Sequence, residues 1–197
     1  MKPCKVNFTV KEWLAFKSYK HPNDVTIKYV PEGYNYGDTS FQFPTYPLYD
    51  AVTEINDPYF IEELIKEGAD PNFHNGHPAL ISLIANNRFY NVCPIVEIFI
   101  KYKVDINAIT KINGNNALHE AAYRWKSSHS EQLVALLINN NADITLRNDE
   151  NLTPYEVVLT SKLWYPQSRS LEYPTKILNM LDVTARNVRL YQSQNKE

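Results

Sequence analysis

The sequence predicts an all-α fold, a solenoid of stacked helix-turn-helix units that follows an N-terminal cap segment. A pattern of two short helical stretches recurs along the chain, and its copies end near Asp70, Asp105 and Asp143, at steps of 35 and 38 residues. A period between about 20 and 50 residues is typical of solenoids and other repeat arrays. A glycine or asparagine stands two positions before the first and the last of these aspartates, where a helix would end. These observations predict a repeat domain over residues 45–182.

Each copy contains a first helix with small residues and a second helix with an apolar face. The copies cover residues 46–72, 78–107, 116–144 and 153–181. In the third copy, Leu133, Leu136 and Leu137 of the second helix have the i, i+3, i+4 spacing of one helical face. A unit of this size has too small a core to be stable alone, so the apolar faces are expected to be buried by stacking on neighbouring units.

The residues after the second helices predict how these helices end. Gly68 occupies the place of a left-handed C-cap residue, and Asn141 and Lys103 occupy the matching places in other copies. Asparagine adopts this conformation more readily than lysine does, so the second copy is predicted to end differently. Turn chemistry predicts positive φ angles in the tips that link the copies, at Gly76, Gly114 and Asn151.

Residues 1–44 do not show the repeat pattern. Thr9 and Glu12 form a capping-box signature that opens a helix, although residues 5–10 also alternate like a short strand. Apolar residues alternate again over residues 25–29. Because terminal units of repeat arrays are atypical, this segment is expected to cover the exposed end of the first copy with its large apolar residues.

The residue pattern resembles the ankyrin repeat, whose unit starts with Thr-Pro-Leu-His-x-Ala-Ala and ends with Gly-Ala-Asp-x-Asn over about 33 residues. The resemblance covers residues 44–182. The third copy retains Leu118, His119, Ala121 and Ala122, the fourth retains Thr153 and Pro154, and the first retains Pro47, Leu48, Gly68, Ala69, Asp70 and Asn72. In the remaining copies the motif histidine is replaced by Tyr49, Ile81 and Glu156.

The resemblance implies a non-catalytic module that binds a protein partner through its concave face and its hairpin tips. Residues just after the first helices line the concave face in this family, so the preferred contact cluster is Tyr123, Arg124 and Trp125. Aromatic and arginine side chains are the ones that most often anchor protein interfaces. Further candidates in the insertions and tips are Asn86, Arg88, Tyr90, His74, Lys111, Asn113, Trp164 and Tyr165. The alternative for Trp125 and Trp164 is that each packs under its own loop as a local core.

Few residues suggest chemistry, and no catalytic, metal or cofactor site is predicted. His74 and His77 have a spacing compatible with a metal, but no second pair of ligands accompanies them. Cys93 and His119 lack a third group that would support nucleophilic catalysis. The resemblance implies instead that His119 hydrogen-bonds the backbone of the adjoining turn. The runner-up function is an enzyme or toxin-like activity in residues 1–44, with the repeats as its targeting arm.

Composition and charge limit the class of partner. A net charge of −2 gives no electrostatic reason to expect nucleic acid, and no apolar run approaches the roughly 18 residues of a membrane span. Residues 183–197 are predicted to form a polar tail. Two cysteines are too few for a disulfide scaffold, so we expect a cytoplasmic protein, and we expect it to be monomeric. Abundant Asn, Ile, Lys and Tyr fit an AT-rich genome and suggest an effector that an intracellular microbe or virus delivers into a host cell.

Overall fold

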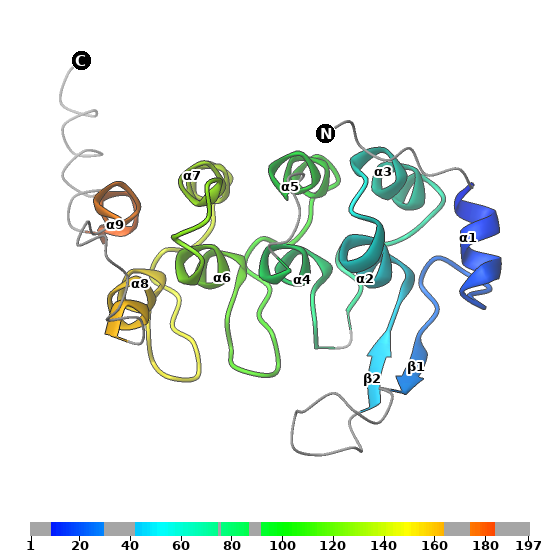
Figure 1. Cartoon of the computed structure of the whole chain (residues 1–197), viewed down its shortest axis with the longest axis horizontal. Helices are drawn as coiled ribbons and strands as arrows, with labels where there is room; N and C mark the ends of the chain where they lie inside the picture. The colour runs from blue at the N-terminus through cyan, green and yellow to red at the C-terminus, as the bar shows by residue number, and fades with distance from the viewer. Residues whose placement is uncertain (1–8, 30–41, 75, 87–91, 164–173, 184–197) are drawn as a thin grey trace. The chain divides into compact units, whose positions relative to one another are not determined.

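The computed structural model describes residues 9–29, 42–74, 76–86, 92–163 and 174–183. These residues form helices joined by short tips, together with a two-stranded sheet (Figure 1). They belong to two compact units, residues 1–104 and residues 105–197. The predicted class of helical repeats is confirmed, and the sheet is an addition to it.

The first unit contains the first two copies of the repeat. Its elements are α1 (Val10–Phe16), β1 (Thr26–Tyr29), β2 (Gln42–Thr45), α2 (Pro47–Asp50), the π-helix η1 (Ala51–Ile55), α3 (Pro58–Lys66), α4 (Ala79–Ala85) and α5 (Val92–Lys101). The first helices, α2 and α4, pack against each other in one layer, and the second helices, α3 and α5, pack in another (Figure 1). Leu48, Leu80 and Ile95 are buried in the core of this unit.

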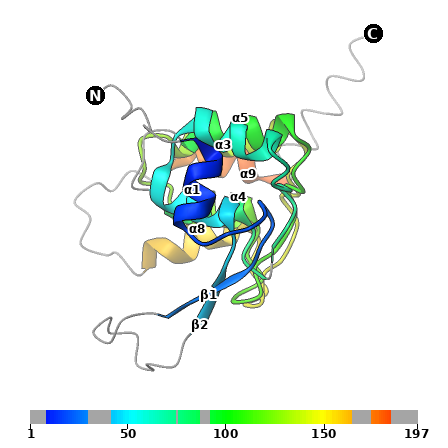
Figure 2. The same ribbon diagram turned by 90° about the vertical axis from the view of Figure 1, so that its right-hand side faces the viewer.

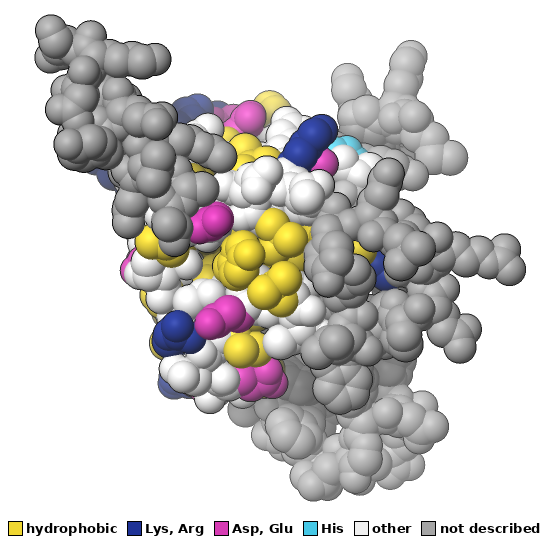
Figure 3. All heavy atoms as spheres, turned by 90° about the vertical axis from the view of Figure 1, so that its left-hand side faces the viewer, with side chains coloured by type: hydrophobic (Ala, Val, Ile, Leu, Met, Phe, Trp, Pro, Cys, Tyr) yellow, Lys and Arg dark blue, Asp and Glu magenta, His cyan; other side chains and the backbone are white. Residues whose placement is uncertain are grey.

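The second unit contains the third and fourth copies. Its elements are α6 (Ala117–Tyr123), α7 (Ser130–Asn139), α8 (Pro154–Leu163) and α9 (Thr175–Leu181). α6 packs against α8, and α7 packs against α9. Ala121 and Ala122 of α6 are fully buried, because small side chains let the helices approach closely. Figure 3 is viewed from the side on which α8 and α9 lie and shows hydrophobic side chains at the surface; Leu159 and Val183 are 38% and 37% exposed.

The second helices of the first three copies end in one shared conformation. Gly68, Lys103 and Asn141 have φ angles of 107°, 59° and 67°. In each case the next N–H donates to a carbonyl five residues back, at 3.0 to 3.1 Å. The prediction that the second copy ends differently was wrong, because Lys103 adopts the left-handed conformation too. Its carbonyl accepts a hydrogen bond from Nδ2 of Asn72 at 3.2 Å, which helps to offset a strain of about 1 kcal/mol.

The N-terminal segment ends its helix in the same way. Ser18, which follows α1, has a φ of 62°. The N–H of Tyr19 donates to the carbonyl of Leu14, also five residues back, at 2.8 Å. α1 therefore has the geometry of the second helix of a repeat, although residues 1–44 do not carry the repeat pattern.

Asn23 links this segment to the first copy through a bridge that a later copy also uses. Its Nδ2 donates to the carbonyl of Gly68 at 3.0 Å, and its Oδ1 accepts the N–H of Asp70 at 2.8 Å. Asn107 makes the same two bonds to the matching backbone groups of the third copy, at 3.2 Å and 2.8 Å. The described part of the N-terminal segment is therefore a partial repeat in its geometry.

Buried aromatic side chains fix α1 on the first copy. Trp13 is 4% exposed and meets Phe60 of α3 edge to face, with ring centroids 5.4 Å apart. The hydroxyl of Tyr19 donates to the buried carboxylate of Asp50 at 3.0 Å. The predicted capping box at Thr9 begins the helix. Figure 2 shows α1 beside α3 on this side of the unit.

Other local predictions are confirmed as well. β1 corresponds to the alternation over residues 25–29, and it pairs with β2 in an antiparallel register. The predicted strand alternative over residues 5–10 falls largely outside the described residues. The tips have the predicted positive φ angles, 112°, 67° and 60°, at Gly76, Gly114 and Asn151.

Candidate protein-binding surface

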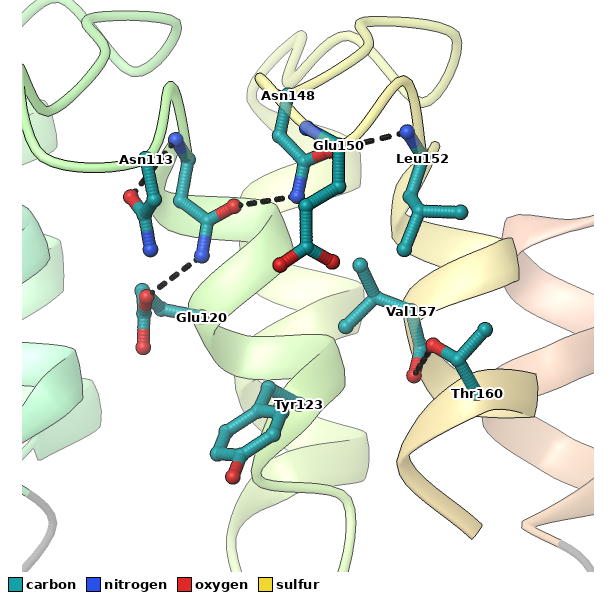
Figure 4. A pocket seen from close by; sticks show the side chains of 9 residues that line it. Asn113, Glu120, Tyr123, Asn148, Glu150, Leu152, Val157 and Thr160 are labelled. Carbon is teal, nitrogen blue, oxygen red and sulfur yellow. Dashed lines mark hydrogen bonds between the residues drawn. The ribbon is translucent and has the colours of Figure 1, made fainter. Parts of the chain in front are cut away.

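The second unit contains a cavity of about 340 Å³ between two hairpin tips and two first helices (Figure 4). We call this cavity the tip pocket. The tip before α6 contributes Asn113 and Asn115 to its lining, and the tip before α8 contributes Asn148, Glu150 and Leu152.

The two helices supply the rest of the lining. Glu120 and Tyr123 project from α6 one helical turn apart, and Val157 and Thr160 project from α8 with the same spacing. The other residues of α6 are buried in the core, so Glu120 and Tyr123 are the ones left to face the pocket. Tyr123 is 49% exposed. The lining therefore combines carboxylates, amides, an aromatic ring and apolar side chains.

Side-chain amides hold the two tips together. Nδ2 of Asn148 donates to Oδ1 of Asn115 at 2.8 Å, and Nδ2 of Asn115 donates to the carboxylate of Glu120 at 2.9 Å. Oδ1 of Asn148 accepts the N–H groups of Glu150 and Leu152 at 3.1 Å and 2.9 Å. Figure 4 shows these bonds along one edge of the pocket. Because both amides are bonded at each end, the walls are fixed by the chain itself.

A backbone contact also joins the tips, and a glycine makes it possible. The N–H of Asp149 donates to the carbonyl of Asn113 at 3.0 Å. Gly114 has a φ of 67°, and a Cβ added to it would lie 2.5 Å from Oδ1 and 2.9 Å from the backbone nitrogen of Asp149. Only glycine fits this position without displacing the second tip.

Replacement of Gly114 by alanine is expected to lower the free energy of unfolding by about 2 kcal/mol, because left-handed strain is added to the clash with Asp149. Gly68→Ala is the matched control. Gly68 also has a positive φ, but a Cβ there would meet nothing within 4 Å, so a loss of about 1 kcal/mol is expected from strain alone. Urea unfolding followed by circular dichroism measures both variants. Equal losses would show that the second tip accommodates the added Cβ at position 114 without cost.

His119 connects α6 to the second tip. Its Nε2 lies 2.9 Å from the carbonyl of Leu152, and its Nδ1 accepts the N–H of Asn116 at 3.3 Å. The contact with a carbonyl requires a proton on Nε2, and Nδ1 lies 2.7 Å from Oδ1 of Asn116 as well. The ring is completely buried, and burial lowers its pKa below the ordinary value for histidine. The neutral ring therefore has the structural role that the resemblance implied.

The first copy makes the same connection with a different residue. Tyr46, at the motif threonine position, donates from its hydroxyl to the carbonyl of His77 at 2.6 Å. Its ring is buried and packs edge to face on Phe73, with centroids 5.4 Å apart. Burial raises the pKa of the hydroxyl, so it remains a donor. This bond explains how the first copy does without a histidine at Tyr49.

The structure separates the three residues of the predicted contact cluster. Tyr123 lines the tip pocket, whereas Arg124 and Trp125 do not. Trp125 is half-buried, and the ammonium group of Lys126 lies 5.1 Å from the centroid of its ring. Arg124 is also half-buried, and its Nε has no hydrogen-bond partner among the described residues. Only Tyr123 of this cluster therefore belongs to the pocket.

The other predicted contact residues have varied surroundings. Asn113 lines the tip pocket, while Lys111 is exposed and does not line it. In the first unit, Nδ2 of Asn86 donates to the carbonyl of Thr53 at 3.0 Å, so this amide has an internal partner. His74 is exposed. The remaining predicted contacts lie outside the described residues: Arg88, Tyr90, Trp164 and Tyr165.

Sequence reasoning named the tips but missed the helix residues Glu120, Val157 and Thr160. The motif itself could have indicated one of them, Glu120. Glu120 lies between the motif histidine and the alanine pair, at the one position of that stretch that the core does not use. A search for such unclaimed positions in the first helices would have paired Glu120 with Tyr123.

The described residues show little that suggests chemistry. Among them, no group of three or more His, Cys, Asp or Glu side chains is placed to hold a metal ion. Cys93 is buried, and burial raises the pKa of its thiol, which opposes formation of the nucleophilic thiolate. In the same part of the chain, no helix is long and apolar enough to cross a membrane.

Comparison with known proteins identifies the repeat. A family model for ankyrin repeats, spanning three copies, matches residues 48–148, just over half of the chain. The chain belongs to the ankyrin-repeat family. Ankyrin repeats are generally protein–protein interaction modules, and their fold is typically a non-catalytic scaffold.

Two known ankyrin-repeat proteins illustrate the similarity. Ankyrin repeat and SAM domain-containing protein 6 of Rattus norvegicus is 28% identical over 102 residues, which is 49% of this chain and 11% of the rat protein. The crystal structure of the ankyrin repeat domain of Bcl-3, a member of the IkappaB protein family, matches with a TM-score of 0.50 and 26% identity. That match covers 70% of this chain and 51% of the Bcl-3 chain. This chain therefore spans a small part of the rat protein and about half of the Bcl-3 domain.

Proposed function

We propose that this ankyrin-repeat chain is a non-catalytic module that binds one protein partner through the tip pocket and the two tips around it. The observation that carries the proposal is the open cavity of about 340 Å³ beside the half-exposed ring of Tyr123. Tyrosine is among the residues that most often anchor protein interfaces. A lining that joins apolar walls with a few placed polar groups is typical of binding sites.

The rigidity of the pocket supports a binding role. The tips are joined by the amides of Asn115 and Asn148 and by the backbone bond between Asp149 and Asn113. A surface that is already ordered loses little conformational entropy when a partner docks. A small number of anchoring side chains can then give useful affinity.

The proposal extends to the oligomeric state, the cellular location and the biological role of the protein. We propose a monomeric protein that acts in the cytoplasm, as a host-directed effector of an intracellular microbe or virus. The support is compositional: two cysteines and an abundance of residues with AT-rich codons. The partner on this view is a protein of the host cell.

The runner-up, a catalytic activity in residues 1–44, has less support. The described part of that segment has a packing role, because Trp13 and Tyr19 are buried against the first copy. His21 is exposed, and its Nδ1 accepts the N–H of Asn23 at 3.2 Å within a turn. These contacts favour a cap over an active site.

The proposal predicts that Tyr123→Ala weakens binding to partner peptides at least about tenfold, because it removes the exposed aromatic anchor. Random peptides displayed on phage are selected against the full chain, and the affinities of the enriched peptides are measured by fluorescence anisotropy. Tyr59→Ala is the matched control, because Tyr59 is 73% exposed but belongs to α3 in the first unit. Both variants should keep their free energy of unfolding within about 1 kcal/mol.

Two outcomes would count against the proposed surface. The first is a set of enriched peptides that bind Tyr123→Ala and the unchanged chain equally well. The second is a loss of binding in Tyr59→Ala as large as that in Tyr123→Ala. Either result would show that the partner does not use the tip pocket.

A further inference from the structure

We infer that the tip pocket takes a basic side chain, a lysine or arginine of the protein partner. The inference rests on the proposed function and names the chemistry of the partner at this surface. Three observations support it: the open tip pocket between α6 and α8, the acceptor capacity of the carboxylates that line it, and their negative charge.

Three side chains of the lining already donate hydrogen bonds within the chain. Nδ2 of Asn148 donates to Oδ1 of Asn115, and Nδ2 of Asn115 donates to the carboxylate of Glu120. The hydroxyl of Thr160 donates to backbone carbonyls of its own helix. The carboxylate of Glu150 has no hydrogen bond or ion pair among the described residues, and Glu120 shows one, from Asn115. The two carboxylates thus keep most of their capacity to accept hydrogen bonds, so the pocket suits a ligand that donates to them.

The charge of the lining selects a cation over a neutral donor. Glu120 and Glu150 both line the pocket, and no Lys, Arg or His of the described part of the chain does so. The basic residue of the second tip, Arg147, is already paired with Glu156 at 2.8 Å. A like charge brought by an acidic partner would be repelled, whereas a guanidinium or ammonium group would gain charge-assisted hydrogen bonds.

The walls of the pocket suit the rest of a basic side chain. Leu152 and Val157 offer apolar surface on the side of α8, and the ring of Tyr123 lies on the side of α6 (Figure 4). Lysine and arginine bury their methylene stems along apolar surface and keep the charged head near polar groups. An aromatic ring adds attraction to a cation placed over its face.

A titration with small probes tests the inference directly. The full chain, labelled with nitrogen-15, is titrated with N-acetyl-arginine methylamide and, separately, with its neutral isostere N-acetyl-citrulline methylamide. We expect saturable amide shifts at Glu120, Tyr123 and Glu150 with the arginine probe, and at least about fivefold weaker binding of the citrulline probe. Absence of saturable shifts at these residues, or equal affinity for the two probes, would overturn the inference.

Charge-removing variants locate the site. The double variant Glu120→Gln, Glu150→Gln should weaken the arginine probe at least about fivefold and leave the citrulline probe unchanged. Glu97→Gln, which removes one negative charge from an exposed position of α5 in the first unit, should change neither affinity. Thermal melts verify that the variants are folded. If the double variant binds the arginine probe with unchanged affinity, the probe binds outside the tip pocket and the inference is overturned.

The outcomes separate this inference from the proposed function. If selected peptides depend on Tyr123 but the arginine probe does not bind, the protein-binding role stands and the basic ligand is rejected. If the arginine probe binds but no selected peptide depends on Tyr123, the cation site stands and the protein-binding role is rejected.

Discussion

Replacement of His119 by alanine is expected to lower the free energy of unfolding by about 3 kcal/mol. The substitution leaves the N–H of Asn116 without its acceptor, and a buried unpaired group costs about 1–3 kcal/mol. It also removes one of two bonds to the carbonyl of Leu152, which keeps the N–H of Asn148 at 3.0 Å. A cavity also remains where the buried ring was. Urea unfolding followed by circular dichroism measures the loss, and hydrogen exchange in α6 and α8 should show where it occurs.

The same histidine should give stability a characteristic dependence on pH. Burial lowers its pKa from the ordinary value of about 6.5, so the unfolded chain binds a proton more readily than the folded chain does. The contribution of the neutral ring is then complete above about pH 6.5 and is lost progressively as the pH falls below that value. His119→Ala should remove this part of the pH dependence.

His74 provides the control for both measurements, because it is an exposed histidine on a tip. His74→Ala removes one hydrogen bond, from the N–H of Gly76 to Nδ1 at 3.2 Å, so it should cost no more than about 1 kcal/mol of the free energy of unfolding. It should also leave the decline in stability below pH 6.5 in place. A similar effect of the two variants would mean that burial of His119 contributes nothing specific.

Replacement of Trp13 by alanine is expected to cost about 4 kcal/mol of the free energy that holds the N-terminal segment on the first copy. The indole ring is 4% exposed and packs on Phe60, and truncation of a buried tryptophan typically costs about 3–5 kcal/mol. Because stability in repeat proteins is a sum over neighbouring units, the end unit should open before the rest. Faster amide exchange in α1 than in α4 would report this opening.

Phe16 is the matched control on the same helix, since its ring is 83% exposed. Phe16→Ala should leave exchange in α1 nearly unchanged, because little apolar surface is lost from the core. If Trp13→Ala behaved like Phe16→Ala, α1 would not be anchored by its indole ring.

The sequence predicted the structure best at positions where the local geometry allows only a few residue types. The left-handed tips at Gly76, Gly114 and Asn151 were predicted because few residues tolerate a positive φ, and the structure confirms them. The apolar spacing likewise identified Leu133 and Leu137 as core positions, since a helix has one face to bury. Leu136, the third residue of that predicted face, is half-buried. Both arguments depend on local geometry alone.

Prediction failed where a contact can be made by more than one residue type. Tyr46 reaches a backbone carbonyl that the motif assigns to a histidine, and nothing in the spacing of the first copy marks this exchange. Lys103 adopts a conformation that asparagine or glycine would adopt more readily, because hydrogen bonds around it offset the strain. These cases depend on tertiary contacts, which a single sequence does not display.

The tip pocket was predicted only in part for the same reason. Tyr123 and Asn113 were recognised from their positions after a first helix and within a tip. Glu120 and Glu150 are separated by 30 residues in the sequence, and they line one cavity only because α6 and the second tip are brought together by packing. Their shared charge becomes visible once the fold is known.

Asn23 attaches the N-terminal segment to two main-chain groups, the carbonyl of Gly68 and the N–H of Asp70. Main-chain groups are the same in every repeat that closes with this backbone geometry, whatever its side chains are. Duplication or deletion of an inner copy during evolution would therefore leave such a fastening intact at the edge of a longer or shorter array. The segment can therefore cap arrays of different lengths, and the number of repeats can change during evolution while the first repeat stays covered.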